Sequence, residues 1–188
     1  MTDIIAQLKQ GNEAAFKDLV ARWQGMVYNT ALGILQNAAD AEDVAQEVFM
    51  QVFESVASFK GESQISTWLY RITVTKCLDH LRKKTRKKRW GKVYSLFGQQ
   101  NELLIDPPDF HHPGVQLADK ERAALLFKAI GRLPESQKVA FVLQKLEGLS
   151  SRQIGEAMDA SVSAVEGLLH RAKQNLREQL EDYYRNED

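Results

Sequence analysis

The chain has 188 residues, of which 44% are hydrophobic, and it carries 25 basic and 25 acidic side chains. No apolar run is long enough to cross a bilayer and the first residues do not resemble a signal peptide, so we expect no membrane insertion. The single cysteine, Cys77, excludes an internal disulfide and favours a cytoplasmic location. The zero net charge is unevenly distributed: −5 over residues 1–59, +9 over 60–92, −3 over 93–120 and −1 over 121–188.

Apolar residues at helical spacing predict two helices in the first 60 residues, the first capped by Asn12. A break at residues 36–39 follows, and Asp40 is the expected N-cap of the second helix. One half of this second helix is apolar: Val44, Ala45, Val48, Phe49, Val52, Phe53 and Val56. The other half carries acidic and polar side chains and one thioether: Asp43, Glu47, Met50, Gln51 and Glu54.

Residues 59–64 have the composition of a loop, and a further helix is expected to begin near Ser66. The apolar residues of this helix lie on two opposite sides, so we expect neighbouring helices to pack against both. Trp68 shares a side with Leu69, which favours packing in the core over stacking on a nucleic-acid base, whereas Tyr70 is expected to be accessible.

The same helix ends in a dense cationic run, in which seven of the eight residues 82–89 are Lys or Arg. Such a density of like charges repels itself and is stabilised by an anionic partner such as the phosphate backbone of nucleic acid. The alternative interpretation is a solvated helix end without a partner.

Residues 90–118 lose the helical periodicity and hold three of the four prolines, which predicts a linker between two helical domains. The second domain is expected to open with a helix over residues 117–131. Pro134 then stands at the first turn of a helix over residues 135–147, and Gly148 is its candidate C-cap.

The most distinct motif of the second domain is a predicted helix-turn-helix. Ser150 and Gln153 fit a capping box at the start of its first helix. Gly155 provides a small residue where the two helices cross, and Asp159 tolerates the left-handed conformation that the turn requires. Ser161 is expected to cap the second helix.

Side chains on one face of that second helix are polar enough to enter a major groove: Ser163, Glu166, Gly167, His170, Arg171 and Lys173. Cations for phosphate contact are sparse here, so the module alone should bind DNA weakly. A plain helical hairpin in a small bundle is the alternative interpretation.

Both halves resemble one family, the extracytoplasmic-function sigma factors, which are two-domain bacterial transcription initiation factors. In the first half the resemblance rests on D-A-E-D-V-A-Q-E-V-F, F-K-G-E-S-Q-I-S-T-W-L-Y-R-I and C-L-D-H-L-R-K-K. In the second it rests on L-P-E-S-Q-K-V-A-F-V-L-Q-K-L-E-G-L-S-S-R-Q-I-G-E and V-E-G-L-L-H-R-A-K. The resemblance implies an all-α protein with sigma region 2 over residues 1–92, a flexible linker over 93–118 and region 4 over 119–188.

The resemblance also implies three binding surfaces. The face of Asp43, Glu47, Met50, Gln51 and Glu54 would bind the clamp helices of core RNA polymerase. A second set would recognise and open the minus-10 promoter element: Lys60, Gly61, Glu62, Ser63, Gln64, Thr67, Trp68, Tyr70, Arg71, Lys76, Arg82, Lys83 and Lys84. A third set would read the minus-35 element: Ser163, Glu166, Gly167, His170, Arg171 and Lys173.

The implied partners are core RNA polymerase, promoter DNA and an anti-sigma factor. Glu166, Gly167 and Leu168 depart from the basic or hydroxyl residues of many family members, so the minus-35 sequence does not carry over, and Thr75 stands where many relatives have Asn. His111 and His112 are not at ligand spacing with other candidate ligands.

No nucleophile and base pair is evident, so we expect neither an enzyme nor a cofactor. Two other classes remain as alternatives. A helix-turn-helix transcriptional regulator that is not a polymerase subunit would leave the acidic and basic helices without a role, and an RNA-binding protein would leave the helix-turn-helix unexplained.

Overall fold

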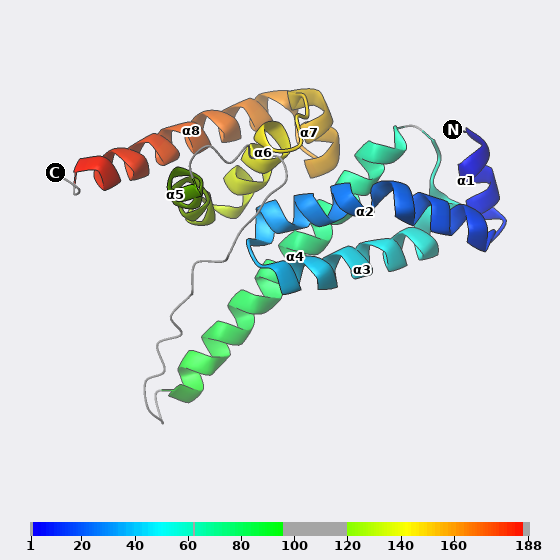
Figure 1. The fold of residues 1–188 in the computed structure, drawn as a ribbon, viewed down its shortest axis with the longest axis horizontal. Helices are drawn as coiled ribbons and strands as arrows, with labels where there is room; N and C mark the ends of the chain where they lie inside the picture. The colour runs from blue at the N-terminus through cyan, green and yellow to red at the C-terminus, as the bar shows by residue number, and fades with distance from the viewer. Residues whose placement is uncertain (1, 62, 96–119, 186–188) are drawn as a thin grey trace.

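The computed structural model describes residues 2–61, 63–95 and 120–185, and these residues form helices and connecting turns with no strand among them (Figure 1). The first part contains α1 (Thr2–Lys9), α2 (Glu13–Leu35), α3 (Ala38–Ser55), the 3-10 turn η1 (Val56–Ser58) and α4 (Ile65–Ser95). The second part contains α5 (Lys120–Gly131), α6 (Glu135–Lys145), α7 (Ser151–Met158) and α8 (Val162–Arg185). The predicted all-α class is confirmed. Most of the predicted linker lies outside the described residues.

The caps at the start of the first bundle are local hydrogen bonds. Asn12 caps α2 as predicted, because its side chain accepts the backbone N–H of Ala15 at 3.2 Å. The prediction that Asp40 caps α3 is wrong. Gln36 ends α2 in the left-handed conformation, so the cap falls to Asn37, whose side chain accepts the N–H of Asp40 at 2.9 Å.

The first bundle is built around α4, which packs against α2 and α3. Val44, Val48 and Val52 of α3 are fully buried and form the stripe that faces this core. Leu69 and Cys77 of α4 are also fully buried. As expected from its two apolar sides, α4 packs on a further helix as well, which is α7 of the second part.

The helix-turn-helix of α7 and α8 has the predicted local geometry. Ser150 and Gln153 form the capping box, and Ser161 accepts the N–H of Ala164 at 3.2 Å. Asp159 has φ 54°, in the left-handed region. A Cβ atom on Gly155 would lie 2.7 Å from the carbonyl oxygen of Ala160, so only glycine permits this close crossing.

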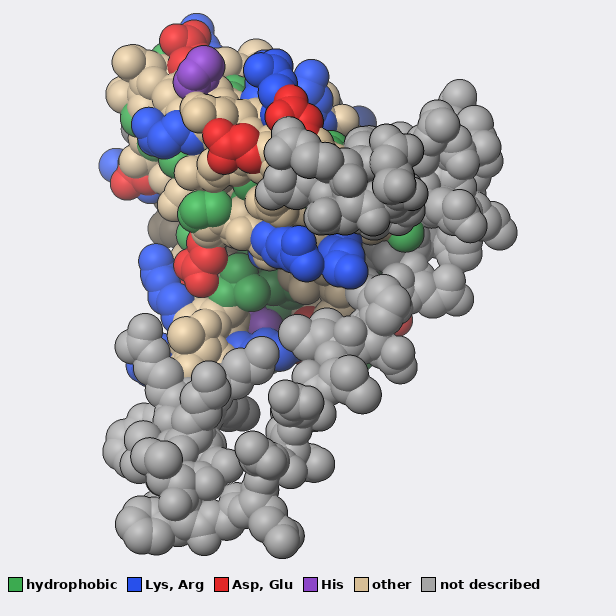
Figure 2. All heavy atoms as spheres, turned by 90° about the vertical axis from the view of Figure 1, so that its left-hand side faces the viewer, with side chains coloured by type: hydrophobic (Ala, Val, Ile, Leu, Met, Phe, Trp, Pro, Cys, Tyr) green, Lys and Arg blue, Asp and Glu red, His purple; other side chains and the backbone are tan. Residues whose placement is uncertain are grey.

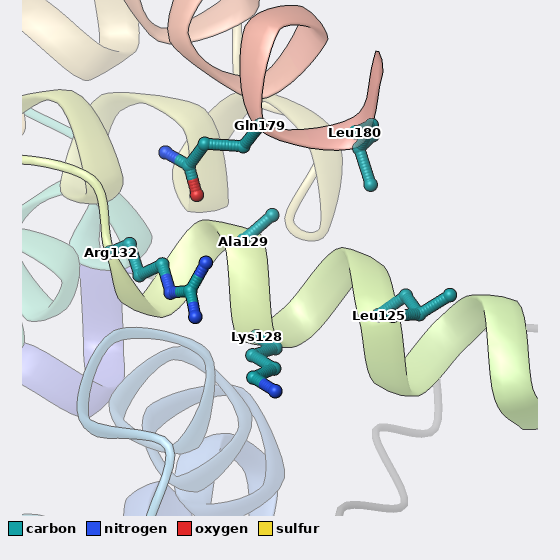
Figure 3. A pocket seen from close by; sticks show the side chains of 6 residues that line it. All are labelled: Leu125, Lys128, Ala129, Arg132, Gln179 and Leu180. Carbon is teal, nitrogen blue, oxygen red and sulfur yellow. The ribbon is translucent and has the colours of Figure 1, made fainter. Parts of the chain in front are cut away.

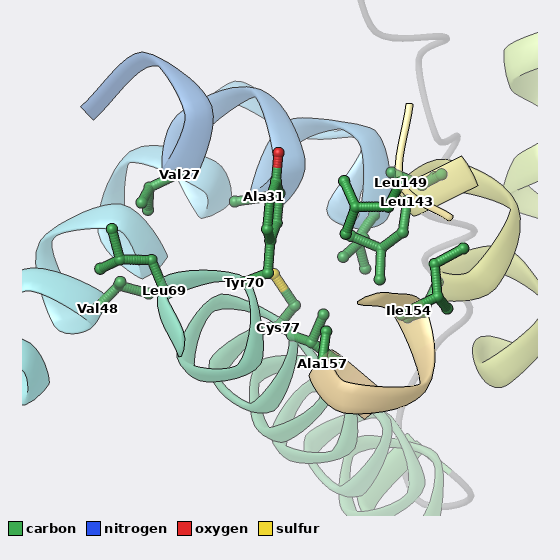
Figure 4. Packing of buried hydrophobic residues seen from close by; sticks show 14 of the residues in the cluster. Val27, Ala31, Val48, Leu69, Tyr70, Cys77, Leu143, Leu149, Ile154 and Ala157 are labelled. Atoms are coloured by element: carbon green, nitrogen blue, oxygen red, sulfur yellow. The ribbon is translucent and has the colours of Figure 1, made fainter. Parts of the chain in front are cut away.

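One hydrophobic cluster extends through both parts of the protein. Figure 4 shows Tyr70 and Cys77 of α4 beside Leu143 of α6 and Ile154 and Ala157 of α7. The two parts are therefore in direct contact through buried side chains. None of the described helices is long and apolar enough to span a membrane.

Candidate functional site

The outer face of α3 is exposed and acidic, as predicted. Asp43, Glu47, Met50 and Glu54 are exposed and Gln51 is half-buried. Met50 is 64% exposed, which is unusual for a large apolar side chain. The face therefore offers carboxylates around an apolar centre.

Phe53 departs from the prediction for this helix. It was placed on the apolar half, but its side chain is 57% exposed. Its ring packs edge-on against Phe16 of α2, with ring centroids 5.3 Å apart, and both line an open groove of about 500 Å³. The groove is lined by Phe16, Val20, Gln46, Phe49, Met50, Phe53 and Glu54. Phe16 and Val20 were not among the predicted site residues, although Phe53 stands only three residues from the predicted Met50.

The loop before α4 presents backbone and polar side chains to solvent. Gly61 has φ 76°, a conformation that glycine adopts without strain. Lys60, Gly61 and Gln64 are exposed and Ser63 is half-buried, whereas Glu62 lies outside the described residues. The indole of Trp68 packs on Phe59 with ring centroids 4.8 Å apart, in agreement with the predicted packing role of this tryptophan.

The first half of α4 is covered where an accessible surface was expected. Tyr70 is only 9% exposed and Thr67 only 5%, so the prediction of an accessible Tyr70 is wrong. The Tyr70 hydroxyl donates a hydrogen bond to Glu147 Oε2 at 3.0 Å. Arg71 pairs with Asp159 of the helix-turn-helix, with N and O atoms 3.6 Å apart. The second part of the protein supplies both partners.

Burial raises the pKa of the Glu147 carboxyl, and the hydrogen bond from Tyr70 offsets part of that rise. Burial, followed by the neighbouring Glu147 charge, also raises the pKa of the Tyr70 hydroxyl. Within the described residues, Glu147 Oε1 is buried without a hydrogen-bond partner. The Thr30 hydroxyl, which donates to the Met26 carbonyl oxygen at 2.8 Å, also lies close enough to the carboxyl to lower its pKa.

The second half of α4 carries exposed cations. Arg82, Lys83 and Lys84 are exposed, while the side chains of residues 87–89 lie outside the described residues. Asp40 of α3 accepts from Lys84 Nζ at 2.6 Å and lies 3.2 Å from His80 Nε2. These contacts hold the cationic end of α4 against the start of α3.

Two ion pairs also connect predicted site residues to acidic neighbours. Arg82 pairs with Asp79 at 3.2 Å, one turn earlier in α4. Lys76, predicted to contact the opened strand, lies 4.0 Å from Glu47, predicted to contact the polymerase. Since these pairs are partly exposed, each contributes little stability and can be exchanged for a phosphate or a protein charge.

The predicted reading face of α8 is exposed within the part of the chain that the structure describes. Ser163, Glu166, His170, Arg171 and Lys173 are exposed, and Gly167 is half-buried. A Cβ atom on Gly167 would lie 3.5 Å from Arg171 Nη1, so the guanidinium lies along the helix beside this glycine. The described face in Figure 2 mixes Lys and Arg with Asp and Glu and does not gather one sign.

A small cavity of about 90 Å³ lies between α5 and α8 (Figure 3). Its lining includes Lys128 of α5, Arg132 just after this helix and Gln179 of α8. The volume is well below the roughly 300 Å³ at which small-molecule sites begin. The described residues contain no cluster of His, Cys, Asp or Glu able to hold a metal ion, and His111 and His112 lie outside them.

These placements define a class of protein. A helix-turn-helix whose second helix is free to enter a groove, combined with a cationic helix on a separate bundle, is typical of DNA-binding transcription factors. The acidic α3 face is a third surface, with the wrong charge for DNA and an apolar centre suited to a protein partner.

Comparisons with known proteins agree with this class. The Sigma-70 region 2 model matches residues 19–87, and the Sigma-70 region 4 model matches residues 123–176. The chain is 31% identical over 181 residues to the ECF RNA polymerase sigma-E factor of Haemophilus influenzae, covering 95% of this chain and 94% of that protein. It is also 31% identical over 180 residues to the ECF RNA polymerase sigma factor SigW of Bacillus subtilis, covering 95% of each.

Solved structures share the fold. A structure of CnrH in complex with the cytosolic domain of CnrY has a TM-score of 0.62 at 22% identity and covers 95% of this chain and 96% of that one. The sigma factor RpoE of Bartonella quintana, in complex with the anti-sigma factor NepR, has a TM-score of 0.65 at 20% identity and covers 88% and 96%.

The chain therefore belongs to the ECF family of RNA polymerase sigma factors. It is an alternative sigma factor, which recognises promoters for RNA polymerase. The predicted family is confirmed.

Proposed function

We propose that the outer face of α3 is the docking surface for core RNA polymerase. Its exposed carboxylates Asp43, Glu47 and Glu54 favour a basic partner, and Met50 and Phe53 add apolar area that is accessible without rearrangement. The adjoining groove against α2 extends this surface, because Met50 and Glu54 belong to both. A helical partner would place an apolar side chain in the groove and basic side chains along its acidic edge.

The loop at residues 59–64 and α4 then bind the minus-10 element. Gly61 allows a close approach of the backbone to a flipped base, and Gln64 and Ser63 offer hydrogen bonds to a base edge. The exposed Arg82, Lys83 and Lys84 are suited to phosphates of the adjacent duplex.

The face of α8 binds the minus-35 element. Arg171 and Lys173 supply cations, and Glu166 can accept a hydrogen bond from cytosine N4. Because the exposed Glu166 shares this face with Arg171 and Lys173, specific contacts rather than general attraction to DNA would select the site.

The observation that carries this function is the separation of three chemically different exposed surfaces on α3, α4 and α8 in the order expected of a sigma factor. The protein acts without catalysis and in the cytoplasm, where polymerase and promoter are found. An anti-sigma factor is a further partner, since the sigma factor RpoE of Bartonella quintana was solved with the anti-sigma factor NepR.

Run-off transcription with purified core polymerase and genomic fragments tests the function. We expect promoter-specific transcripts that core polymerase alone does not produce. Asp43→Lys with Glu47→Lys should weaken polymerase binding by about tenfold or more, because two attractive charges become repulsive. Glu178→Lys with Glu181→Lys on exposed α8 positions makes the same change in net charge and is the matched control. Absence of specific transcripts would refute the function, and equal binding by both variants would refute the α3 surface.

A further inference from the structure

Met50 is the one exposed sulfur-containing residue among those that the structure describes. It is 64% exposed, whereas Met26 of α2 and Met158 of α7 are half-buried and pack against the hydrophobic cluster. Met1 lies outside the described residues. Within the described part of the chain, a reagent that attacks sulfur from solvent therefore meets Met50 first.

The thiol of Cys77 does not compete for such a reagent. Cys77 is fully buried in α4, and burial raises the pKa of its thiol to about 12. The thiolate is the form of cysteine that reacts with oxidants, so a buried thiol with a raised pKa is inert at neutral pH. Oxidation of the described residues is therefore directed to a thioether and not to a thiol.

Met50 stands at the centre of the surface proposed to bind polymerase. Glu47 lies one turn before it on α3 and Glu54 one turn after it, and both carboxylates are exposed. Met50 also lines the groove between α2 and α3, together with Phe16 and Phe53. The thioether thus connects the acidic edge of the surface to its apolar groove, and a partner that docks on both would bury it.

The Met50 sulfur can accept an oxygen atom from a hydroperoxide such as hydrogen peroxide. A sulfur lone pair attacks one peroxide oxygen, so that a sulfur–oxygen bond forms and the O–O bond breaks. The departing hydroxide takes the proton from the transferred oxygen and leaves as water. Sulfur is oxidised by two electrons and the peroxide is reduced by two. Hydrogen peroxide is uncharged, so Glu47 and Glu54 do not repel it.

The sulfoxide product is poorly suited to the same surface. Oxidation converts a flexible apolar thioether into a polar group whose oxygen accepts hydrogen bonds. Glu47 and Glu54 cannot satisfy this oxygen, because carboxylates accept hydrogen bonds and do not donate them. A partner that buries the sulfoxide beside the apolar groove leaves its oxygen without a donor, which weakens binding.

We propose that Met50 is a reversible oxidation site, at which hydroperoxides convert the thioether to a sulfoxide and thereby weaken docking of core RNA polymerase on α3. The inference rests on the proposed function and adds a modification to its polymerase-binding surface. Methionine sulfoxide reductases, one for each epimer, return the sulfoxide to the thioether. Bound polymerase covers Met50, so the modification acts on the free factor.

Mass mapping of the free protein tests whether oxidation is selective. Wild-type protein is treated with hydrogen peroxide for increasing times, and each methionine is followed in its peptide. We expect Met50 to gain one oxygen at least about fivefold faster than Met26 or Met158, because oxidation follows exposure. Core polymerase added before the peroxide should slow the oxidation of Met50 and leave that of Met26 unchanged.

Polymerase affinity tests the consequence of oxidation, with each protein compared before treatment and after treatment and removal of the peroxide. Treated wild-type protein should bind at least about fivefold more weakly, and incubation with both sulfoxide reductases should restore its affinity. Met50→Leu removes the reactive sulfur, so treatment should change its affinity by less than about twofold. Met26→Leu is the matched control: it conserves volume, retains Met50 and should lose affinity as the wild type does.

Three results would overturn the proposal: oxidation of Met26 or Met158 as fast as Met50, unchanged affinity once the Met50 sulfoxide is complete, or an equal loss of affinity in Met50→Leu. Untreated wild-type protein that does not bind polymerase would instead contradict the proposed function. Oxidation of Met50 at one rate with and without bound polymerase would contradict the α3 surface. Mapping of the free protein needs no polymerase, so it tests selective oxidation in either case.

Discussion

The first half of α4 and the first half of α8 are both proposed to read promoter DNA, but they differ in what covers them. The face of α8 is exposed from Ser163 to Lys173, whereas Thr67 and Tyr70 of α4 are nearly buried. The exposed face of α8 is formed by residues close together in the sequence. The covered face of α4 lies under residues that are about 80 positions away in the chain. A helix that is proposed to bind DNA can therefore be fully formed while part of its surface is covered by the rest of the chain.

The difference has a physical origin in the sidedness of each helix. The apolar residues Val165, Leu169 and Leu176 of α8 form one buried stripe and leave the remainder to solvent. α4 has apolar residues on two sides, so it buries apolar area against α2 and α3 and again against α7. The second burial covers Tyr70, whereas Arg71 stays exposed and pairs with Asp159 at the surface.

The largest effect is expected at the cationic end of α4, which is exposed and is not covered by region 4. Affinity falls as salt rises, and each phosphate contact contributes about 0.9 to the steepness of log affinity against log salt. Replacing Arg82, Lys83 and Lys84 with alanine should therefore make this dependence shallower by about 2.7. This corresponds to a loss on the order of a hundredfold in open-complex formation at low salt, measured with core polymerase. Alanine at Lys9, Lys17 and Arg22, also exposed, removes equal charge and should leave the slope unchanged.

A smaller effect should follow from a substitution that disturbs the packing of α7 against the turn before α8 in the helix-turn-helix. Gly155→Ala forces a Cβ against the Ala160 carbonyl oxygen, a backbone atom that cannot rotate away. We expect a loss of about 1–3 kcal/mol in unfolding free energy, measured by denaturant titration, together with weaker minus-35 binding. Gly167→Ala, whose Cβ would make ordinary contact with Arg171, should instead stabilise α8 slightly. Similar stability of the two variants would show that the crossing is less tight than the structure indicates.

The smallest effect concerns the pH dependence of the contact between the two parts of the protein, in which Tyr70 donates to Glu147. Burial within this contact raises the Glu147 pKa, which returns toward its usual value where the two parts separate and the carboxyl is exposed. The contact is therefore favoured below the usual carboxyl pKa, and this contribution is lost as pH rises through the raised value. We expect a few-fold larger fraction of protein with the two parts in contact at pH 5 than at pH 7.5, seen as a smaller radius of gyration by X-ray scattering.

Glu147→Gln is the control for this pH effect, because it keeps a polar partner for Tyr70 and cannot ionise. The two parts of this variant should stay in contact across the range. A pH response identical to that of the wild type would assign the effect to groups other than Glu147.

Local signals made most of the fold predictable. The capping box, the crossing glycine and the left-handed Asp159 stand within ten residues, so the helix-turn-helix could be recognised without knowledge of the tertiary structure. The cap of α3 was misplaced because Asn37 and Asp40 are both good capping residues. The left-handed turn at Gln36 decided between them.

The outer face of α3, which we propose binds polymerase, was partly predictable for a similar reason. Helical periodicity separated the acidic half of α3 from its buried valines, and these valines are fully buried. Phe53 lies at the boundary between the apolar and the acidic half of α3, where helical periodicity does not predict whether a side chain is buried or exposed. Its exposure depends on where α2 stops covering α3, and the groove with Phe16 follows from that packing.

The amino-acid sequence alone determined the helical class, the family, the exposed faces of α3 and α8 and the cationic end of α4, because these follow from periodicity, capping and charge within short segments. The tertiary structure alone decided that Tyr70 is covered and that Glu147 is its partner, since 77 positions separate them and only packing brings them together. It also showed why Gly33 is glycine, where α2 and α6 meet. Contacts between distant segments depend on how two apolar surfaces fit, and no local pattern records that fit.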